Sequence, residues 1–425
     1  MKTLKLTLMM CLTLAFSFNS FAQKRDLDNF RPRDQRGINV FEAPKDTVTT
    51  FDGLKVRVGG ASTIQFQALD HENSGAVPLA TLGDNFNLAT ANLDLDVALY
   101  DGVRMHLRTY LSARHHPEAW VKGGYLLIDK LEFVGEGFMA DAMQYLTFKF
   151  GHMEINYGDA HFRRTDNAMA MYNPFIGNYL MDSFTTEVGF EGYFRKNGWL
   201  AMLGVTNGKL NQSVSLNPNS NLETKPVFLA KLGYDKQLTQ DTRFRLMGSL
   251  YTTSESSKNF LYDGDRAGSR YYFVLEEEGA SASGDFRSGR VNPGFGTEVT
   301  SIMINPFIKH KGLEFFGVYE NSTGKGFGPN PPSRTYNHYA ADLIYRFGAN
   351  EDVYIGGRYS YVDGEHSSGQ DISVDRLQLG AGWFMTKNVL AKLEYVNQSY
   401  SDYPVGDIFA GGQFDGLMLE AVISF

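Results

Sequence analysis

The chain has 425 residues, a formal net charge of −8, one cysteine, 44 glycines, 32 phenylalanines and 23 tyrosines. A single cysteine excludes a disulfide framework, and with an acidic balance we expect no nucleic-acid partner. Beyond its N-terminal run the chain has no apolar stretch long enough for a membrane helix, so a membrane protein of this composition would have to cross with strands.

Residues 1–22 are predicted to be a cleavable signal peptide. Lysines precede an apolar run at 6–18, and small residues precede Gln23, which is the order of a secretory leader. The run is short for a permanent span, and an uncleaved anchor is the alternative. Cys11 lies within the run, so the mature chain would contain no cysteine.

Residues 23–53 are polar and show no sustained period. We expect a periplasmic N-terminal segment, partly disordered, that leads into the fold. The segment contains several arginines, including Arg31, Arg33 and Arg36. The alternative is that it folds back into the mouth of the barrel that the following strands predict.

From Leu54 onward apolar and polar residues alternate, as in two-faced strands. Leu54, Val56 and Val58 share one face, and Lys55 and Arg57 share the other. Many of these segments have ten residues or more, the length that a tilted strand needs to cross a bilayer. Strands are expected near 54–69, 87–100, 103–114, 124–134, 143–151, 185–195, 199–207, 226–235, 242–252, 298–309, 313–321, 335–347, 353–362, 372–385, 389–399 and 414–425.

The connections between these strands alternate between short and long. Asp101-Gly102 is a strong signal for a tight hairpin, whereas 152–184 and 253–297 are long, the latter with the composition of a mobile surface loop. The connection at 135–142 is of medium length, although the alternation predicts a short turn at this point. Short turns on one side and long loops on the other are typical of outer-membrane barrels, with both termini in the periplasm.

The fold class predicted for 54–425 is therefore all-β: a transmembrane antiparallel β-barrel of about sixteen strands, with short periplasmic turns and long external loops. A soluble sandwich or propeller is the rival interpretation. Aromatic residues near strand ends on the apolar face, such as Tyr345, Phe347 and Trp383, favour the membrane barrel because they suit an interfacial girdle.

The stretch from Leu146 to Tyr179 has a strand ending in Phe-Lys-Phe-Gly and then a long loop. It resembles the middle of the phosphate-selective porins (O/P type), and GVTNG at 204–208 is similar to a strand end in that family. The terminal Phe425 resembles the signal that the barrel assembly machinery reads. The resemblance implies a porin in the outer membrane of a Gram-negative bacterium, surrounded by lipid. It also implies a passive diffusion channel for small polar solutes, a homotrimer, and no cofactor.

In such porins the third external loop folds inward and narrows the channel. We expect this constriction loop at about 152–184, and its mixed charges would set a field across the channel. The alternative is that these charges pair with one another and only maintain the shape of the loop. The charged residues concerned are His152, Glu154, Asp159, His161, Arg163, Arg164 and Asp166.

The polar face of the predicted strands carries more basic than acidic residues. A basic wall concentrates anions, which predicts a mild preference for phosphate-like anions. The alternative is cross-strand pairing, for example of Asp94 and Asp96 with the arginines of the next strand. The cations assigned to the pore wall are Arg57, Arg104, Arg108, Arg114, Lys231, Arg243, Arg245, Arg358 and Arg376.

The sequence bears on two functions other than a porin. A closed or plugged barrel acting as a surface receptor, adhesin or structural protein remains open as the alternative to a porin. An enzyme would need a nucleophile, a base and an acid on neighbouring strands. His106 and Ser112 are roughly 20 Å apart along one strand, so we expect no enzymatic activity, and no spacing of residues predicts a metal site.

Overall fold

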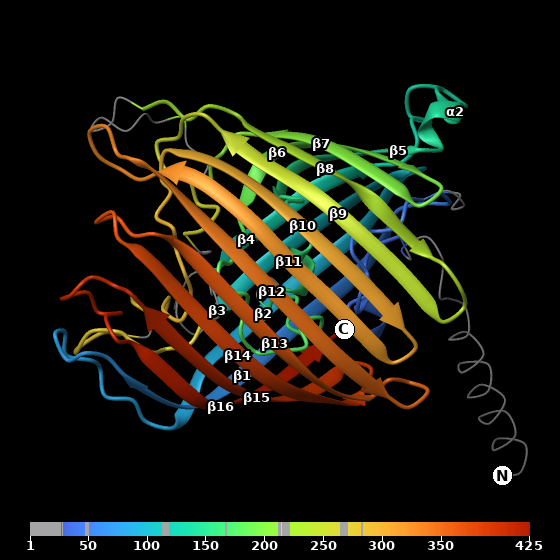
Figure 1. The fold of residues 1–425 in the computed structure, drawn as a ribbon. Helices are drawn as coiled ribbons and strands as arrows, with labels where there is room; N and C mark the ends of the chain where they lie inside the picture. The colour runs from blue at the N-terminus through green and yellow to red at the C-terminus, as the bar shows by residue number, and fades with distance from the viewer. Residues whose placement is uncertain are drawn as a thin grey trace, which may run out of the picture.

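The computed structural model is a closed barrel of sixteen antiparallel strands (Figure 1). It describes residues 27, 29–46, 51–112, 119–165, 168–210, 214, 222–263, 271–281 and 284–425. The predicted signal peptide lies outside the described residues. Each strand pairs with its neighbours in chain order, and β1 pairs with β16 to close the barrel.

All sixteen predicted strands are present. They are β1 Lys55–Glu72, β2 Asn85–Tyr100, β3 Val103–Ser112, β4 Trp120–Ile128, β5 Leu146–Glu154, β6 Thr186–Lys196, β7 Trp199–Thr206, β8 Val227–Gln237, β9 Thr242–Thr253, β10 Glu298–His310, β11 Leu313–Lys325, β12 Ser333–Phe347, β13 Val353–Glu365, β14 Asp371–Thr386, β15 Val389–Ser401 and β16 Gln413–Ser424. Short helical turns occur at η3 (Gln35–Gly37), α2 (Ala140–Met143) and η4 (Ala160–Arg163).

The largest error in the strand boundaries concerns β4, which was expected at 124–134 and ends at Ile128. The next residue, Asp129, turns into the barrel, where its carboxylate accepts hydrogen bonds from Arg104 Nη2 (2.6 Å) and Thr147 Oγ1 (2.7 Å). These charge-assisted contacts end the strand. The apolar residues that suggested a longer strand, Phe133 and Val134, lie exposed in the connection to β5.

The connections define two ends of the barrel. At the turn end, most pairs of strands are joined by short turns such as Asn197-Gly198, where both residues have positive φ (51° and 90°), as type I′ hairpins require. The exception is the β4–β5 connection, which contains α2 and projects from the barrel (Figure 1). At the loop end the connections are long. Both β1 and β16 reach the turn end, where Phe425 and Gly60 exchange backbone hydrogen bonds of 2.9 and 3.0 Å.

The outer face of the barrel is apolar. Alternate residues such as Val56, Leu93, Leu343 and Leu419 are about half exposed and point away from the lumen, and Trp383 lies near the turn end of β14. An exposed apolar band of this extent is the surface that contacts lipid in transmembrane barrels.

No helix of the described residues is both long and apolar enough to span a membrane.

The lumen contains three segments, which we call the N-terminal insert (29–46), the β5–β6 insert (the described residues of 155–185) and the β9–β10 insert (the described residues of 254–297). The expectation of a periplasmic lead-in at 23–53 needs correction for its described part. Residues 29–46 lie inside the turn end of the barrel, where Arg33 contacts Asp94 and Glu42 contacts Arg245. Polarity without a period suggested solvent, but these polar groups are satisfied by opposite charges on the wall.

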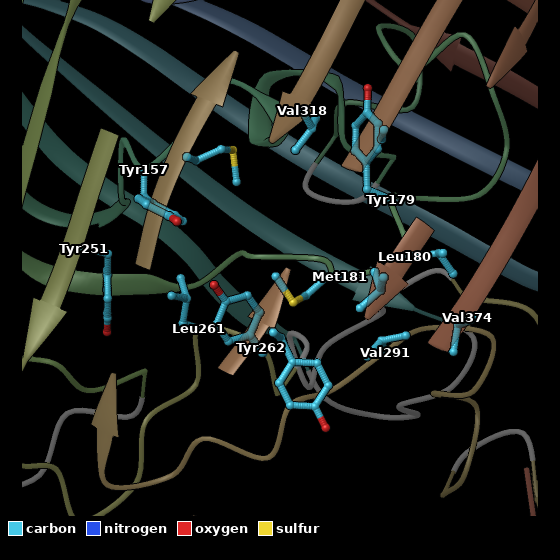
Figure 2. Close-up of a cluster of buried hydrophobic side chains, with 14 of the residues drawn as sticks. Tyr157, Tyr179, Leu180, Met181, Tyr251, Leu261, Tyr262, Val291, Val318 and Val374 are labelled. Carbon is cyan, nitrogen blue, oxygen red and sulfur yellow. The ribbon is translucent and has the colours of Figure 1, made fainter. Parts of the chain in front are cut away.

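The interpretation of 253–297 as a mobile surface loop is also wrong for most of its described residues. Leu261, Tyr262 and Val291 are buried and pack against Leu180 and the adjoining Met181 of the β5–β6 insert (Figure 2). Backbone hydrogen bonds join the two inserts, from Phe184 N to the Leu261 carbonyl (2.9 Å) and from Val291 N to the Leu180 carbonyl (2.7 Å). Much of the apolar core of the described residues therefore lies inside the barrel, and a second cluster, with Tyr172, Phe384 and Leu390, lies nearer the turn end.

Candidate functional site

The predicted wall cations on the β1–β3 side face the lumen and pair with aspartates. Arg108 Nε donates to Asp94 Oδ1 at 2.6 Å, and Arg57 Nη2 donates to Asp96 Oδ2 at 2.7 Å. Arg104 pairs with Asp129 instead of with either of these aspartates, as described above. The cross-strand pairing that was weighed as an alternative is therefore present for Asp94 and Asp96.

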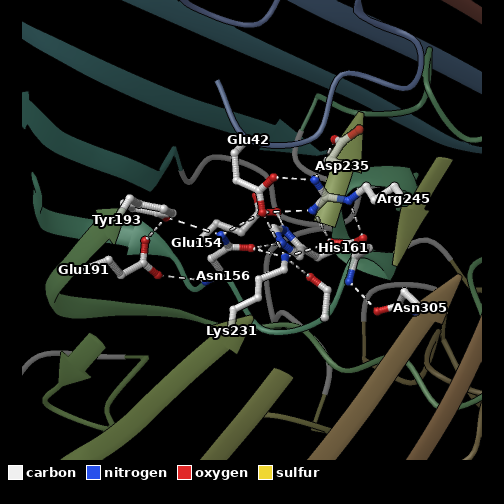
Figure 3. Close-up of polar contacts among 12 residues, drawn as sticks. Glu42, Glu154, Asn156, His161, Glu191, Tyr193, Lys231, Asp235, Arg245 and Asn305 are labelled. Atoms are coloured by element: carbon white, nitrogen blue, oxygen red, sulfur yellow. Dashed lines mark hydrogen bonds and ion pairs between the residues drawn. The ribbon is translucent and has the colours of Figure 1, made fainter. Parts of the chain in front are cut away.

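Two further wall cations, Lys231 on β8 and Arg245 on β9, hold the inserts in place (Figure 3). Both contact Asp159 of the β5–β6 insert at 2.7 Å. They also contact Glu42 of the N-terminal insert, at 3.1 and 2.9 Å. Burial alone would raise the pKa of Glu42, but the charges of Arg245 and Lys231 hold that pKa well below its usual range. The nearby Arg243 pairs with Asp235 at 2.6 Å.

The remaining described wall cations, on β13 and β14, bind the β5–β6 insert. Arg358 donates to Asp342 Oδ1 at 2.6 Å and to the Gly177 carbonyl at 3.2 Å. Arg376 donates to the Asn178 carbonyl at 2.8 Å. These cations therefore help to position the insert, while the predicted wall residue Arg114 lies outside the described residues.

The charges expected on the constriction loop are all placed except Asp166, which lies outside the described residues. Glu154 and His161 pair at 2.5 Å, and Arg163 reaches Glu314 of β11 at 2.7 Å. Arg164 pairs with Asp182 at 2.9 Å within the same insert. Together with Asp159, these residues hold the insert to itself and to the opposite wall.

His152 does not belong to the loop. The strand β5 continues to Glu154, so His152 is a strand residue that pairs with Val188 of β6. Val188 is exposed on the outer face, and directly paired residues share a face. The assignment of His152 and Glu154 to a constriction loop is therefore wrong, because the strand ends three residues later than the sequence pattern indicated.

Tyrosines of the two loop-end inserts donate to carboxylates of the wall. Tyr262 donates to Glu320 at 2.7 Å, and Tyr272 donates to Glu394 at 2.6 Å. Burial and the charge of Glu320 raise the pKa of Tyr262 well above its usual value, and burial and Glu394 do the same for Tyr272. The hydroxyls therefore keep their protons and anchor the β9–β10 insert.

We predict that replacing Tyr262 and Tyr272 together by phenylalanine will loosen the β9–β10 insert. Each change removes a donor from a buried carboxylate, at about 1–3 kcal/mol each. Limited proteolysis from the loop end should cut this insert faster in the double variant than in the unmodified protein. Tyr403→Phe is the control, because the Tyr403 hydroxyl makes no hydrogen bond to the described residues. Equal cleavage of all three proteins would contradict the prediction.

A cavity of about 130 Å³ remains in the lumen between the N-terminal insert, the β5–β6 insert and the wall from β3 to β6. Two glutamates line it, Glu42 and Glu154, and its walls also include Phe30, Phe162 and Tyr125. Asp94 is fully buried behind the arginines and does not line the cavity. The cavity is therefore basic. Its seven cationic side chains are Arg31, Arg33, Arg104, Arg108, Lys122, Lys149 and Arg195.

Several of these residues were missed on the sequence. Lys122 was not assigned to the wall, because its part of β4 was expected to be a loop. Arg31 and Arg33 were noticed only as part of an arginine-containing segment. The sequence contains no signal for them, because Arg104 and Arg108 of the next strand already match the two charges of Asp94 and Asp96, and only the structure shows that Arg104 pairs with Asp129 instead.

No protein-family model matches the sequence, and no curated protein matches it. Among solved structures, an anion-selective porin from Comamonas acidovorans is similar, with 10% sequence identity and a TM-score of 0.55; the match covers 88% of this chain and 100% of that chain. OmpF of Salmonella typhi, in complex with daunomycin, has 12% identity and a TM-score of 0.53 over 88% and 98% of the two chains. OmpT, an outer membrane protein of Vibrio cholerae in a trimer form, has 12% identity and a TM-score of 0.50 over 88% and 100%. At these identities the likeness concerns the fold alone: this chain has the closed, sixteen-strand barrel fold of outer-membrane porins.

Proposed function

We propose that this protein is an outer-membrane porin of a Gram-negative bacterium, a passive diffusion channel for small polar solutes with a mild preference for anions. The observation that carries the proposal is the basic cavity in the lumen, where seven cationic side chains face two glutamates. A similar fold occurs in a porin that is described as anion-selective.

The mechanism follows from the field inside a low-dielectric wall. Cations that line a narrow passage raise the local concentration of anions and oppose the entry of cations. The acidic partners Asp94 and Asp96 have no solvent exposure, so the arginines in front of them meet the solute first. The β5–β6 insert is the constriction in this proposal, because it confines the passage to the side of β3–β6.

Other parts of the proposal rest on sequence patterns. Residues 1–22 would direct export, and Phe425 would be read by the barrel assembly machinery. A homotrimer is part of the proposal, and the similar OmpT structure is a trimer form.

A second candidate is a plugged barrel that acts as a surface receptor, adhesin or structural protein. It is favoured by the filling of the lumen, since buried residues of all three inserts form one core cluster with the wall. The two functions differ in conductance, because a plugged barrel in this state passes no ions.

The test is single-channel recording of the purified mature protein in planar bilayers. A porin should give discrete conductance steps. Under a salt gradient, the sign of the reversal potential should show that anions permeate more readily than cations. Absence of steps would favour the plugged barrel, and a cation-selective reversal potential would reject the anion preference. Liposome swelling with sugars, phosphate and amino acids would then define the solute.

A further inference from the structure

We infer that the basic cavity is a binding site for a short-chain dicarboxylate, and that the N-terminal insert completes this site through Arg31. The inference deepens the proposed function and rests on it, because a ligand reaches the cavity only through the lumen. It adds a ligand class and a role for residues 29–46.

Arg31 is a buried cation without an anionic partner. Its guanidinium donates to the carbonyls of Gly37 (2.9 Å) and Phe162 (3.1 Å) and lies 3.7 Å from the centre of the Tyr172 ring. None of the described carboxylates forms an ion pair with it. Carbonyls and a ring solvate the charge without neutralising it, and an unpaired buried charge is costly.

The charged groups around Arg31 add to the excess of positive charge in this part of the lumen. Three arginines, Arg33, Arg57 and Arg108, share the two aspartates Asp94 and Asp96. Burial lowers the pKa of Arg31 to about 10; Tyr172 and Glu154 act against this shift, and the like charges of Arg33 and Arg108 act with it. Arg31 is still protonated at neutral pH, so the site has an excess of positive charge that a bound anion would offset.

A second cavity cation also has no ion pair with the described residues. Arg195 donates to Thr147 Oγ1 at 3.5 Å and lies 5.1 Å from the centre of the Tyr193 ring. The cavity thus offers two guanidinium groups that form no ion pair with a described carboxylate, one from the N-terminal insert and one from β6. Guanidinium groups bind carboxylates in a forked geometry, and two such groups suit a ligand with two carboxylates.

The size and lining of the cavity narrow the ligand class. A volume of about 130 Å³ holds several water molecules and is large enough for one small ligand. Phe30, Phe162 and Leu127 also line it, which gives apolar contacts to a short carbon chain. Inorganic phosphate could use the arginines but not these apolar walls, so we assign the site to a dicarboxylate such as succinate.

The experiment is calorimetric titration of the detergent-solubilised protein with succinate and, separately, with inorganic phosphate. Arg31→Gln removes the unpaired charge and should weaken succinate binding by about tenfold or more, as expected for losing a charged hydrogen bond. Arg36→Gln is the matched control. It makes the same substitution five residues away, at a side chain that is 57% exposed and pairs with Asp34. Its affinity should stay within about twofold of the unmodified protein.

Each outcome decides the inference. Binding that is lost in Arg31→Gln and kept in Arg36→Gln supports it, whereas no succinate binding, or equal binding in all three proteins, overturns it. Phosphate binding as tight as succinate binding overturns the dicarboxylate class. If Arg31→Gln fails to fold, Arg31→Lys keeps the charge without the fork and should show an intermediate affinity. Conductance steps without succinate binding would reject this inference alone, and binding without conductance would reject the porin.

Discussion

Deletion of residues 29–46 is expected to raise the single-channel conductance several-fold. The N-terminal insert crosses the turn end of the lumen and contacts widely separated parts of the wall. Arg33 reaches Asp94 on β2, and Gln35 N donates to the Lys387 carbonyl beyond β14 (2.8 Å). Asn39 donates to a wall carboxylate of β11 at 2.7 Å. A segment that spans the lumen in this way obstructs ion flow, and its removal widens the path.

The barrel should tolerate this deletion. Its closure depends on backbone pairing of β1 with β16, which runs from Ala61 to Glu72 and does not involve the insert. The insert is held mainly by polar contacts, and the wall groups keep other partners after its removal. Arg245 retains Asp159 at 2.7 Å, and Glu314 retains Arg346 at 3.1 Å.

The matched control for this deletion is removal of residues 133–139. This segment belongs to the β4–β5 connection at the same end of the barrel, is exposed throughout, and projects away from the lumen (Figure 1). Its removal should leave the conductance unchanged. Equal conductance of the unmodified protein and the 29–46 deletion, with both barrels folded, would show that the N-terminal insert does not obstruct the path.

The barrel itself could be predicted from the sequence because its signal is local. Alternation along a strand is set by residues two positions apart, and turns such as Asp101-Gly102 and Asn197-Gly198 carry their own conformational preference. Arg104, Arg245 and Arg358, which the same alternation placed on the polar face, are all buried in the structure. Errors arose where a tertiary contact ended or extended a strand, as at Asp129.

The contacts of the inserts could not be predicted from local patterns, because their partners are distant in the chain. An inward fold of 152–184 was expected only through the resemblance to porins, and a fold-back of 23–53 was only an alternative. Glu42 contacts Arg245, which is 203 residues away in the chain, and Tyr272 contacts Glu394, which is 122 residues away. No period marks such contacts. A polar loop and a polar insert have similar compositions, and only the unmatched charges of the wall, together with tyrosines such as Tyr262 in the loops, distinguish them. The cavity is lined by strand residues and by insert residues. Local alternation can predict which strand residues face the lumen, but it cannot predict the insert residues.

Replacing Asp342 by asparagine is expected to destabilise the folded barrel by about 3–5 kcal/mol, the cost of leaving a buried charge without its partner. Asp342 has no solvent exposure and joins the wall to the β5–β6 insert. It accepts from Arg358 Nε at 2.6 Å and from the Tyr179 hydroxyl at 2.8 Å, and Arg163 lies 3.5 Å away. An amide keeps the shape but removes the negative charge that these two arginines share.

The measurement is the denaturant concentration at which half of the barrel is unfolded. Unfolding is monitored on gels, where folded and unfolded protein differ in mobility. Asp363→Asn is the matched control on the adjacent strand. Asp363 is half-buried and accepts one hydrogen bond from the neutral Asn337 (2.9 Å), so its replacement should cost less than about 1 kcal/mol. The contrast follows from the charge that each aspartate neutralises: two buried guanidinium groups in one case and none in the other. If the two variants were equally stable, the ion pairs of Asp342 would not be what holds the β5–β6 insert against β12 and β13.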